Sequence, residues 1–106
     1  MKVIPRVVAT FCLAASMVSP ASAQTSGVEI YKSKCVLCHG DAGLGDTSVG
    51  KAMKAASYKD PAVVKATDAE LTAVVKNGKG NMAAFGKTLT DAQIKAVIAY
   101  VRTLQK

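Results

Sequence analysis

The chain has one histidine, His39, and no tryptophan among its 106 residues. A closed zinc site needs four ligands, and no second cluster of cysteine or histidine is present to complete one. The sequence also lacks a glycine-rich phosphate-binding loop, a nucleophile beside a free histidine, and paired carboxylates at helical spacing. Because these absences remove the usual catalytic groups, we expect a protein that is not an enzyme.

Residues 1–23 have the pattern of a cleaved secretory signal peptide. Lys2 and Arg6 give a positive start, residues 7–18 form an apolar run, and Ala21-Ser22-Ala23 matches the A-x-A cleavage signal. The run is shorter than the about 20 apolar residues of a membrane-spanning helix. We therefore predict export to the periplasm, a mature domain over residues 24–106, and no membrane insertion after cleavage.

The mature domain has few large side chains with which to build a core. Domains of this size commonly need a metal, a disulfide or a cofactor to complete their packing. Cys12 leaves with the leader, so no disulfide framework remains. The aromatic residues of the mature domain are Tyr31, Tyr58, Phe85 and Tyr100.

The two cysteines that remain belong to one motif, Cys35-Val36-Leu37-Cys38-His39. C-x-x-C-H is the spacing that attaches a c-type haem. Two thiolates on one helical turn can add to the two vinyl groups of a porphyrin, and the next residue then lies under the iron. We predict one covalently attached haem c, with Cys35 and Cys38 as thioethers and His39 as an axial iron ligand that donates from its other ring nitrogen to a backbone carbonyl. A thioredoxin-like redox pair is the alternative interpretation of C-x-x-C.

The second axial ligand cannot be a histidine of this chain, so a methionine, a weaker donor such as lysine, or an open site remains. Met53 lies in a segment that we interpret as a short helix, where its expected role is apolar packing. Met82 ends the stretch Asn77-Gly78-Lys79-Gly80-Asn81-Met82. Because glycines free this loop from helical restraint, it can lay a thioether over the porphyrin, and we predict Met82 as the ligand.

The hydrophobic periodicity predicts helices throughout and no paired strand. Thr67 and Thr90 each begin a capping-box pattern, and Asp60-Pro61 matches a helix start. The expected helices cover residues 27–38, 60–64, 67–77 and 90–104; residues 40–50 are expected to form a loop, and 51–60 are ambiguous. The last helix carries an apolar stripe of Ile94, Val97, Ile98, Val101 and Leu104. The fold class is all-α.

Three segments resemble those of a known family: Gly27 and Tyr31 before the C-x-x-C-H motif, residues 78–82 with Phe85, and the closing helix with Tyr100. With them, essentially the whole mature chain resembles the small soluble bacterial class I cytochromes c. The resemblance implies about three to five helices around the haem, with the first and last helices packed through Gly27, Tyr31 and Tyr100. Family members commonly carry proline after the ligand methionine, and Ala83 stands there in this chain, which implies a less rigid loop.

The resemblance also implies electron transfer. A filled sixth coordination site leaves no place for a substrate on the iron, which favours a carrier of single electrons. Two other hypotheses stay open: a haem sensor or small catalytic haem protein with an open or labile sixth site, and a dedicated subunit of a larger dehydrogenase or oxidase.

Charge suggests what the mature domain meets. Without Lys2 and Arg6, twelve lysine and arginine residues face seven acids, a formal charge of +5 before the haem propionates. Lys76, Lys79 and Lys87 bracket the methionine loop and are predicted to steer a redox partner with an acidic surface, although solvated lysines are common on small domains. We expect a monomer, and no nucleic-acid binding, because export removes the encounter and no basic run alternates with aromatic residues.

Overall fold

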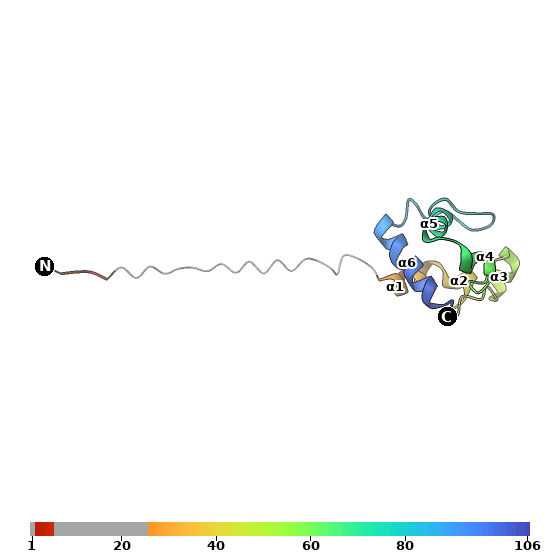
Figure 1. Cartoon of the computed structure of the whole chain (residues 1–106), viewed down its shortest axis with the longest axis horizontal. Coiled ribbons are helices and arrows are strands. Elements are labelled where there is room, and N and C mark those ends of the chain that lie inside the picture. Colours follow the sequence, from red (N-terminus) through yellow and green to blue (C-terminus); the bar gives the residue numbers. More distant parts are fainter. Residues whose placement is uncertain (1, 6–25) are drawn as a thin grey trace.

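The computed structural model describes residues 2–5 and 26–106, and the described part is all-α, as expected (Figure 1). The predicted signal peptide and its cleavage signal lie outside the described residues, apart from residues 2–5. Within the described part, none of the helices has the length and apolar character needed to cross a membrane. The helices are α1 (Gly27–Lys34), α2 (Val36–His39), α3 (Ser48–Met53), α4 (Pro61–Lys65), α5 (Asp68–Asn77) and α6 (Asp91–Thr103).

Helix starts follow the capping signals of the sequence. Thr90 and Gln93 form the complete capping box at the start of α6, with bonds of 3.1 and 2.8 Å. Asp60 caps α4 by accepting a hydrogen bond from the Ala62 amide at 2.9 Å. At α5, Thr67 accepts from the Glu70 amide at 3.1 Å, which is the first half of the predicted box. The side chain of Glu70 instead lines a cavity described below.

Helix α3 differs from the sequence prediction, which expected a loop over residues 40–50. The Thr47 hydroxyl accepts a hydrogen bond from the Gly50 amide at 2.8 Å and so begins a helix at Ser48. The helix ends at Met53, and Lys54 follows it in the left-handed conformation with φ of 57°. The glycines of the segment suggested a loop, but one threonine cap and tertiary contacts stabilise a short helix there.

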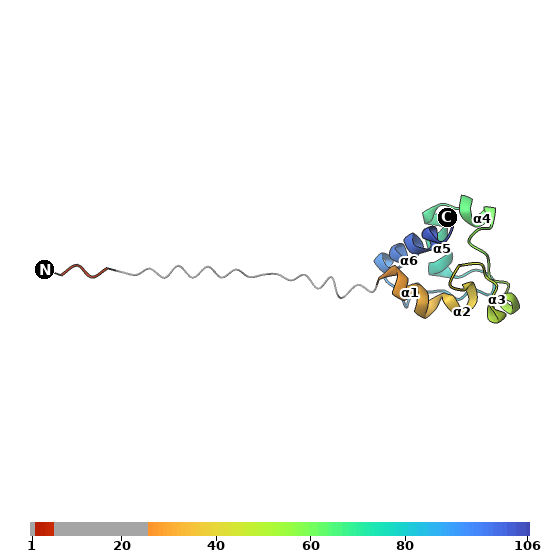
Figure 2. The same ribbon diagram turned by 90° about the horizontal axis from the view of Figure 1, so that it is seen from below.

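Helices α1 and α6 cross and form the centre of the core, and both views show them side by side (Figures 1 and 2). A Cβ atom on Gly27 would lie 2.7 Å from the carbonyl carbon of Ala96, so only glycine permits this approach. The rings of Tyr31 and Tyr100 pack at 5.1 Å and 59°. The predicted contact of the first and last helices is therefore confirmed. The buried core consists of Ile30, Tyr31, Tyr58, Leu89, Ile94, Val97, Ile98 and Val101, and Leu104 packs against it.

Polar contacts hold α4 and α5 against α6. Arg102 of α6 donates hydrogen bonds to the carbonyl oxygens of Val63 and Ala66 and forms an ion pair of 2.9 Å with Asp68. At the other end of α5, the ammonium group of Lys76 lies 3.0 Å from a carboxylate oxygen of Asp91. These contacts set the distance between α5 and α6, which form two walls of the cavity.

Candidate haem-binding site

The C-x-x-C-H motif forms one helical turn directly after α1. Cys35 ends α1 by donating its amide to Tyr31 at 2.9 Å, and its own carbonyl then accepts from the His39 amide at 2.9 Å. Gly40 ends the turn with φ of 80°, a value that favours glycine. Both cysteines are half-buried. The turn therefore brings two thiols and an imidazole to one short stretch of backbone.

His39 is oriented by a backbone carbonyl. Its Nδ1 lies 3.0 Å from the carbonyl oxygen of Ala56. Because a carbonyl only accepts, Nδ1 carries the proton and Nε2 keeps its lone pair, which is the tautomer that a metal requires. Burial lowers the pKa of the imidazole below its ordinary value, and the bond to Ala56 opposes this shift. The side chain is therefore a neutral nitrogen donor at neutral pH.

Two tyrosines contact the motif and its end: Tyr58 packs on His39, and Tyr31 bonds to Gly40. The ring of Tyr58 stacks on His39 with centroids 4.7 Å apart and planes inclined by 22°. The hydroxyl of Tyr31 donates to the carbonyl oxygen of Gly40 at 2.6 Å. Burial raises the pKa of Tyr31 to about 12, and it also raises that of Tyr58 well above its ordinary value. Both phenols therefore stay neutral: Tyr58 packs on the imidazole, and Tyr31 holds the backbone at the end of the motif.

Thr47 and Gly50 attach α3 to the motif. The Thr47 hydroxyl donates to the carbonyl oxygen of Leu37 at 2.7 Å and lies 3.2 Å from that of Cys38. At Gly50 a Cβ atom would overlap the Cys38 carbonyl oxygen, so the backbones of α2 and α3 are in direct contact. This contact fixes the position of α3 against the motif, and the chain then leaves α3 toward Ala56.

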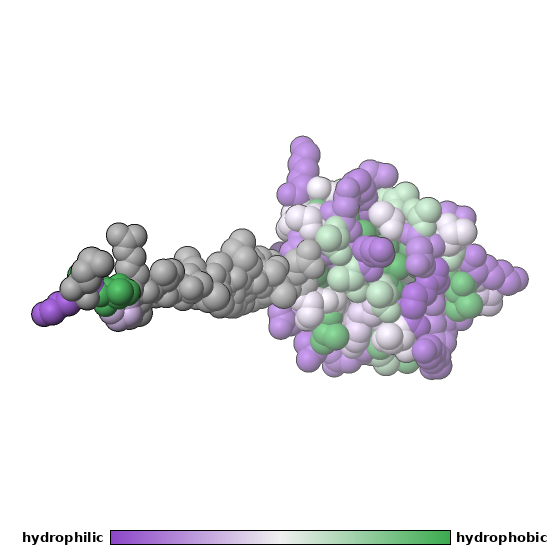
Figure 3. Space-filling model, turned by 60° about the vertical axis from the view of Figure 1, so that its left-hand side comes forward, coloured by the Kyte–Doolittle hydropathy of each residue, from purple (hydrophilic) through white to green (hydrophobic). Residues whose placement is uncertain are grey.

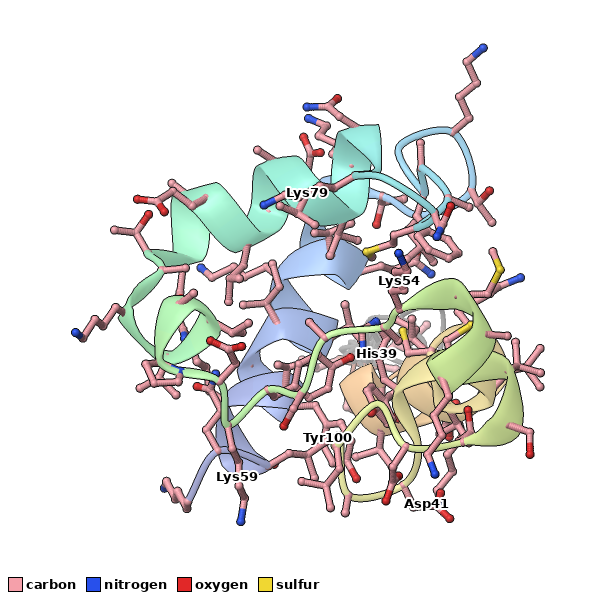
Figure 4. The ribbon with its side chains drawn as sticks, turned by 90° about the vertical axis from the view of Figure 1, so that its right-hand side faces the viewer. His39, Asp41, Lys54, Lys59, Lys79 and Tyr100 are labelled. Carbon is pink, nitrogen blue, oxygen red and sulfur yellow. The ribbon has the colours of Figure 1, made fainter. Side chains whose placement is uncertain are left out.

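His39 lines a cavity of about 290 Å³. This volume is near the lower end of those typical of cofactor and ligand sites. Figure 4 shows His39 in the middle of the domain, with Lys79 and Lys54 toward the top of the view and Tyr100 of α6 toward the bottom. Almost all of the lining side chains are apolar, and Glu70 and Lys79 are the charged ones. The lining residues are Cys35, His39, Ala56, Tyr58, Ala62, Val63, Ala66, Glu70, Leu71, Val74, Val75, Lys79, Met82, Phe85, Leu89, Val97, Ile98 and Val101.

The two methionines of the mature domain occupy different places. Met82 is half-buried and lines the cavity together with His39. Met53 is 42% exposed at the end of α3 and is not among the lining residues. Because Met53 is this exposed, it contributes little to the apolar packing that the sequence led us to expect of it.

The donor set and the cavity fit a covalently attached haem. A neutral imidazole nitrogen and a thioether are ligands found on haem iron, and a thiol beside them lines the same apolar space. Burial raises the pKa of the Cys35 thiol to about 11, and the neighbouring Cys38 adds to the shift. Cys38 is not among the lining residues.

Comparison with known proteins agrees with this chemistry. Residues 22–101 match the family described as cytochrome C oxidase, cbb3-type, subunit III. Cytochrome c6 of Gloeothece citriformis (strain PCC 7424) is 39% identical over 89 residues, which cover 81% of this chain and 77% of that protein. The chain belongs to the class I cytochrome c family. As a c-type cytochrome it is an electron carrier that bears covalently bound haem c and exchanges electrons with redox partner proteins.

Two solved cytochrome structures and one longer relative are also similar to this chain. The KustC0563 c-type cytochrome superposes with a TM-score of 0.70 at 27% identity, covering 77% of this chain and all of that one. Cytochrome c6C from Synechococcus sp. PCC 7002 gives a TM-score of 0.58 at 31% identity, covering 74% of this chain and 94% of that one. The cbb3-type cytochrome c oxidase subunit FixP of Azorhizobium caulinodans is 33% identical over 84 residues, which make up 77% of this chain but 27% of FixP.

Sequence reasoning missed several residues of the site. The Ala56 carbonyl has no side-chain signal, because any residue could supply it. Tyr58 lies in a segment whose structure the sequence leaves ambiguous, and its one signal is that the mature domain has few aromatic residues. Val74 and Val75 lie three and four residues after Leu71 on α5, so the three share one helix face, and that face lines the cavity. Of the three predicted rim lysines, Lys76 is paired with Asp91, and the structure brings only Lys79 to the cavity.

Proposed function

We propose that this cytochrome is a periplasmic carrier of single electrons that holds one haem, with His39 and Met82 as the axial ligands and Cys35 and Cys38 as the thioethers. One observation carries the proposal: His39 and Met82 line the same apolar cavity, while the Ala56 carbonyl leaves Nε2 of His39 available. Residues 1–23, with the pattern of a signal peptide, support export before cleavage.

The haem, when bound, supplies the one-electron chemistry. Cys35, Cys38, His39 and Met82 would hold it, and the apolar lining of the cavity would shield it from water. With both His39 and Met82 bound to the iron, no coordination site would be left for a substrate, which supports a carrier rather than an enzyme. A monomer is sufficient for this role, because every residue of the proposed site comes from one chain.

Two methionine variants test the ligand assignment on the haem-loaded protein. Met82→Ala should abolish the weak long-wavelength absorption from sulfur to ferric iron, lower the reduction potential and let carbon monoxide bind the reduced haem. Met53→Ala is the matched control and should change none of these properties, because Met53 lies outside the cavity lining. Intact mass of the wild type should equal residues 24–106 plus one haem.

The opposite pattern would reject the assignment. If the absorption band survived in Met82→Ala and vanished in Met53→Ala, the ligand would be Met53. If carbon monoxide bound the reduced wild type without displacing a ligand, the site would be open, and a sensor or catalytic haem protein would be favoured. A mature protein without the mass of one haem would remove the basis of the proposal.

The charge of the surface supports a partner with an acidic docking surface. Hydrophilic residues cover much of the face of the domain in Figure 3, with hydrophobic residues in small separate areas. Lys79 is exposed and lies at the cavity, close to where an electron would enter or leave. Lys87 is exposed as well, whereas part of the charge of Lys76 is neutralised by Asp91. Lys79 is therefore the residue whose charge should matter most.

Oxidation of the reduced protein by the hexacyanoferrate(III) anion measures this steering. The second-order rate should fall as salt shortens the Debye length below about 10 Å. Lys79→Glu should lower the rate at low salt more than Lys59→Glu, a control of equal charge change that lies well away from Lys79 in Figure 4. Equal effects of the two substitutions would mean that only net charge acts, and that Lys79 is an ordinary solvated lysine.

A further inference from the structure

Met82 belongs to a tight turn that has little packing of its own. The amide of Lys79 donates to the carbonyl oxygen of Met82 at 3.2 Å, and the amide of Met82 donates to that of Lys79 at 2.9 Å. Gly80 has φ of 56°, as expected of the first central residue of a type II′ turn, and a Cβ atom there would meet nothing within 4 Å. Gly80 and Asn81 are exposed. The turn is thus held together internally, but other contacts must fix its position on the domain.

One side chain of the turn reaches across the domain to α3. The amide nitrogen of Asn81 donates to the carbonyl oxygen of Met53 at 3.0 Å, which joins residues 28 positions apart. Met53 is the last residue of α3, and Lys54 then turns the chain with its left-handed conformation. Carbonyl groups in the last turn of a helix lack intrahelical donors, so Asn81 satisfies one of them. Figure 4 shows the two chain segments on either side of this bond, marked by Lys79 and Lys54.

We propose that Asn81 is a positioning residue: by holding the turn of residues 79–82 against the end of α3, it keeps Met82 at the cavity. The proposal rests on the proposed role of Met82 as the iron ligand. The backbone of Gly78 lies against the turn, since a Cβ atom there would be 2.7 Å from the Met82 carbonyl oxygen. Ala83 adds no restraint of the kind that a proline ring gives to the chain.

The expected effect is modest, because the bond is exposed to water. Net stabilisation by one hydrogen bond between neutral groups corresponds to about a two- to tenfold change in an equilibrium constant. The equilibrium concerned is local opening of the turn, which removes Met82 from the cavity while the helices stay folded. Loss of the Asn81 amide should therefore raise the open population about two- to tenfold. Unfolding of the helices from the open state should be unchanged, because the open state already lacks this bond.

The experiment compares wild type, Asn81→Ala and Asn81→Asp as haem-loaded proteins, with Asn77→Ala as the matched control. An ionised aspartate has nearly the shape of asparagine but cannot donate to the Met53 carbonyl. Denaturant titrations are followed by the sulfur to ferric iron absorption and by far-ultraviolet circular dichroism. Hydrogen exchange of the Met82 amide, which is bonded inside the turn, is measured in the same four proteins.

Both Asn81 variants should lose the sulfur absorption at lower denaturant with an unchanged dichroism midpoint, and their Met82 amide should exchange about two- to tenfold faster. Asn77→Ala should match wild type. If the absorption and the dichroism shifted together, or if the exchange rate of Met82 did not change, the positioning role would be refuted. If wild type had no sulfur absorption, ligation by Met82 would be refuted instead, and the exchange rates would still decide whether Asn81 holds the turn.

Discussion

Replacement of Arg102 should separate α4 and α5 from α6 and so weaken two walls of the haem cavity. The guanidinium group of Arg102 donates to the carbonyl oxygens of Val63 and Ala66 at 3.3 and 2.5 Å. It also donates to a carboxylate oxygen of Asp68 at 3.0 Å from Nε. Val63 and Ala66 both line the cavity, so this single side chain holds the wall in place from behind.

The size of the effect follows from the exposure of the partners. Asp68 is 74% exposed, and exposed ion pairs typically contribute about 0.2–1 kcal/mol. The two carbonyl oxygens are half-buried, and a hydrogen bond from a charged donor contributes about 1.5–3 kcal/mol. We expect Arg102→Ala to lower the free energy of unfolding by about 2–4 kcal/mol, and Asp68→Ala by about 1 kcal/mol or less.

Urea titration of the haem-loaded protein, followed by far-ultraviolet circular dichroism, measures both changes. Arg102→Lys keeps the charge but not the planar fork of donors, so it should recover only a small part of the loss. Added salt should reduce the effect of Asp68→Ala and leave most of the effect of Arg102→Ala. Equal losses in the two alanine variants would show that the ion pair alone acts and that the carbonyl bonds contribute nothing, which would refute the reasoning.

Two further predictions concern the motif. Gly50→Ala should lower the free energy of unfolding by about 1–3 kcal/mol, because the added methyl group would overlap the Cys38 carbonyl oxygen. Urea titration measures this loss, with the exposed Ser48→Ala as the control. Equal stabilities of the two variants would contradict the contact. Tyr31→Phe should cost about 1 kcal/mol at neutral pH, because the Gly40 carbonyl loses its donor. The folded-state pKa of Tyr31, about 12, is raised above the ordinary 10.0, so above pH 10 the unfolded chain loses this proton first and the wild type loses stability. The stability advantage of the wild type over Tyr31→Phe should therefore shrink above pH 10. An advantage that grew with pH would contradict this sign.

Much of the fold could be predicted because its signals are local. The caps at Asp60 and Thr90 and the apolar stripe of α6 are short patterns with a direct physical cause, and each appears in the structure. The start of α3 at Ser48 could not be read in this way. Its Thr47 cap is as local as those at Asp60 and Thr90, but the glycines of the segment favoured a loop, and the hydrogen bond from Thr47 to the Leu37 carbonyl of α2 is a tertiary contact.

The candidate site likewise has residues that local sequence predicts and residues that depend on tertiary structure. The C-x-x-C-H motif and the choice between two methionines follow from residue type and spacing, and their assignment to iron stays a prediction. The backbone acceptor at Ala56 and the stacking of Tyr58 could not be predicted, because they depend on how a segment of ambiguous structure returns to the motif. The lysines near the loop also required the structure, since spacing alone cannot reveal that Lys76 pairs with Asp91.

The two sides of the proposed iron site are held very differently. His39 is fixed by the Ala56 carbonyl, by stacking on Tyr58 and through its own carbonyl, which accepts from the Gly45 amide at 2.8 Å. Met82 depends on the internal bonds of one turn and on the single amide of Asn81. Because one exposed hydrogen bond joins the Met82 turn to α3, we expect the proposed ligand Met82 to leave more readily than His39. In the proposed site, the stability of this turn would decide whether the iron keeps Met82, as in a carrier, or loses it, as in a sensor with an open site.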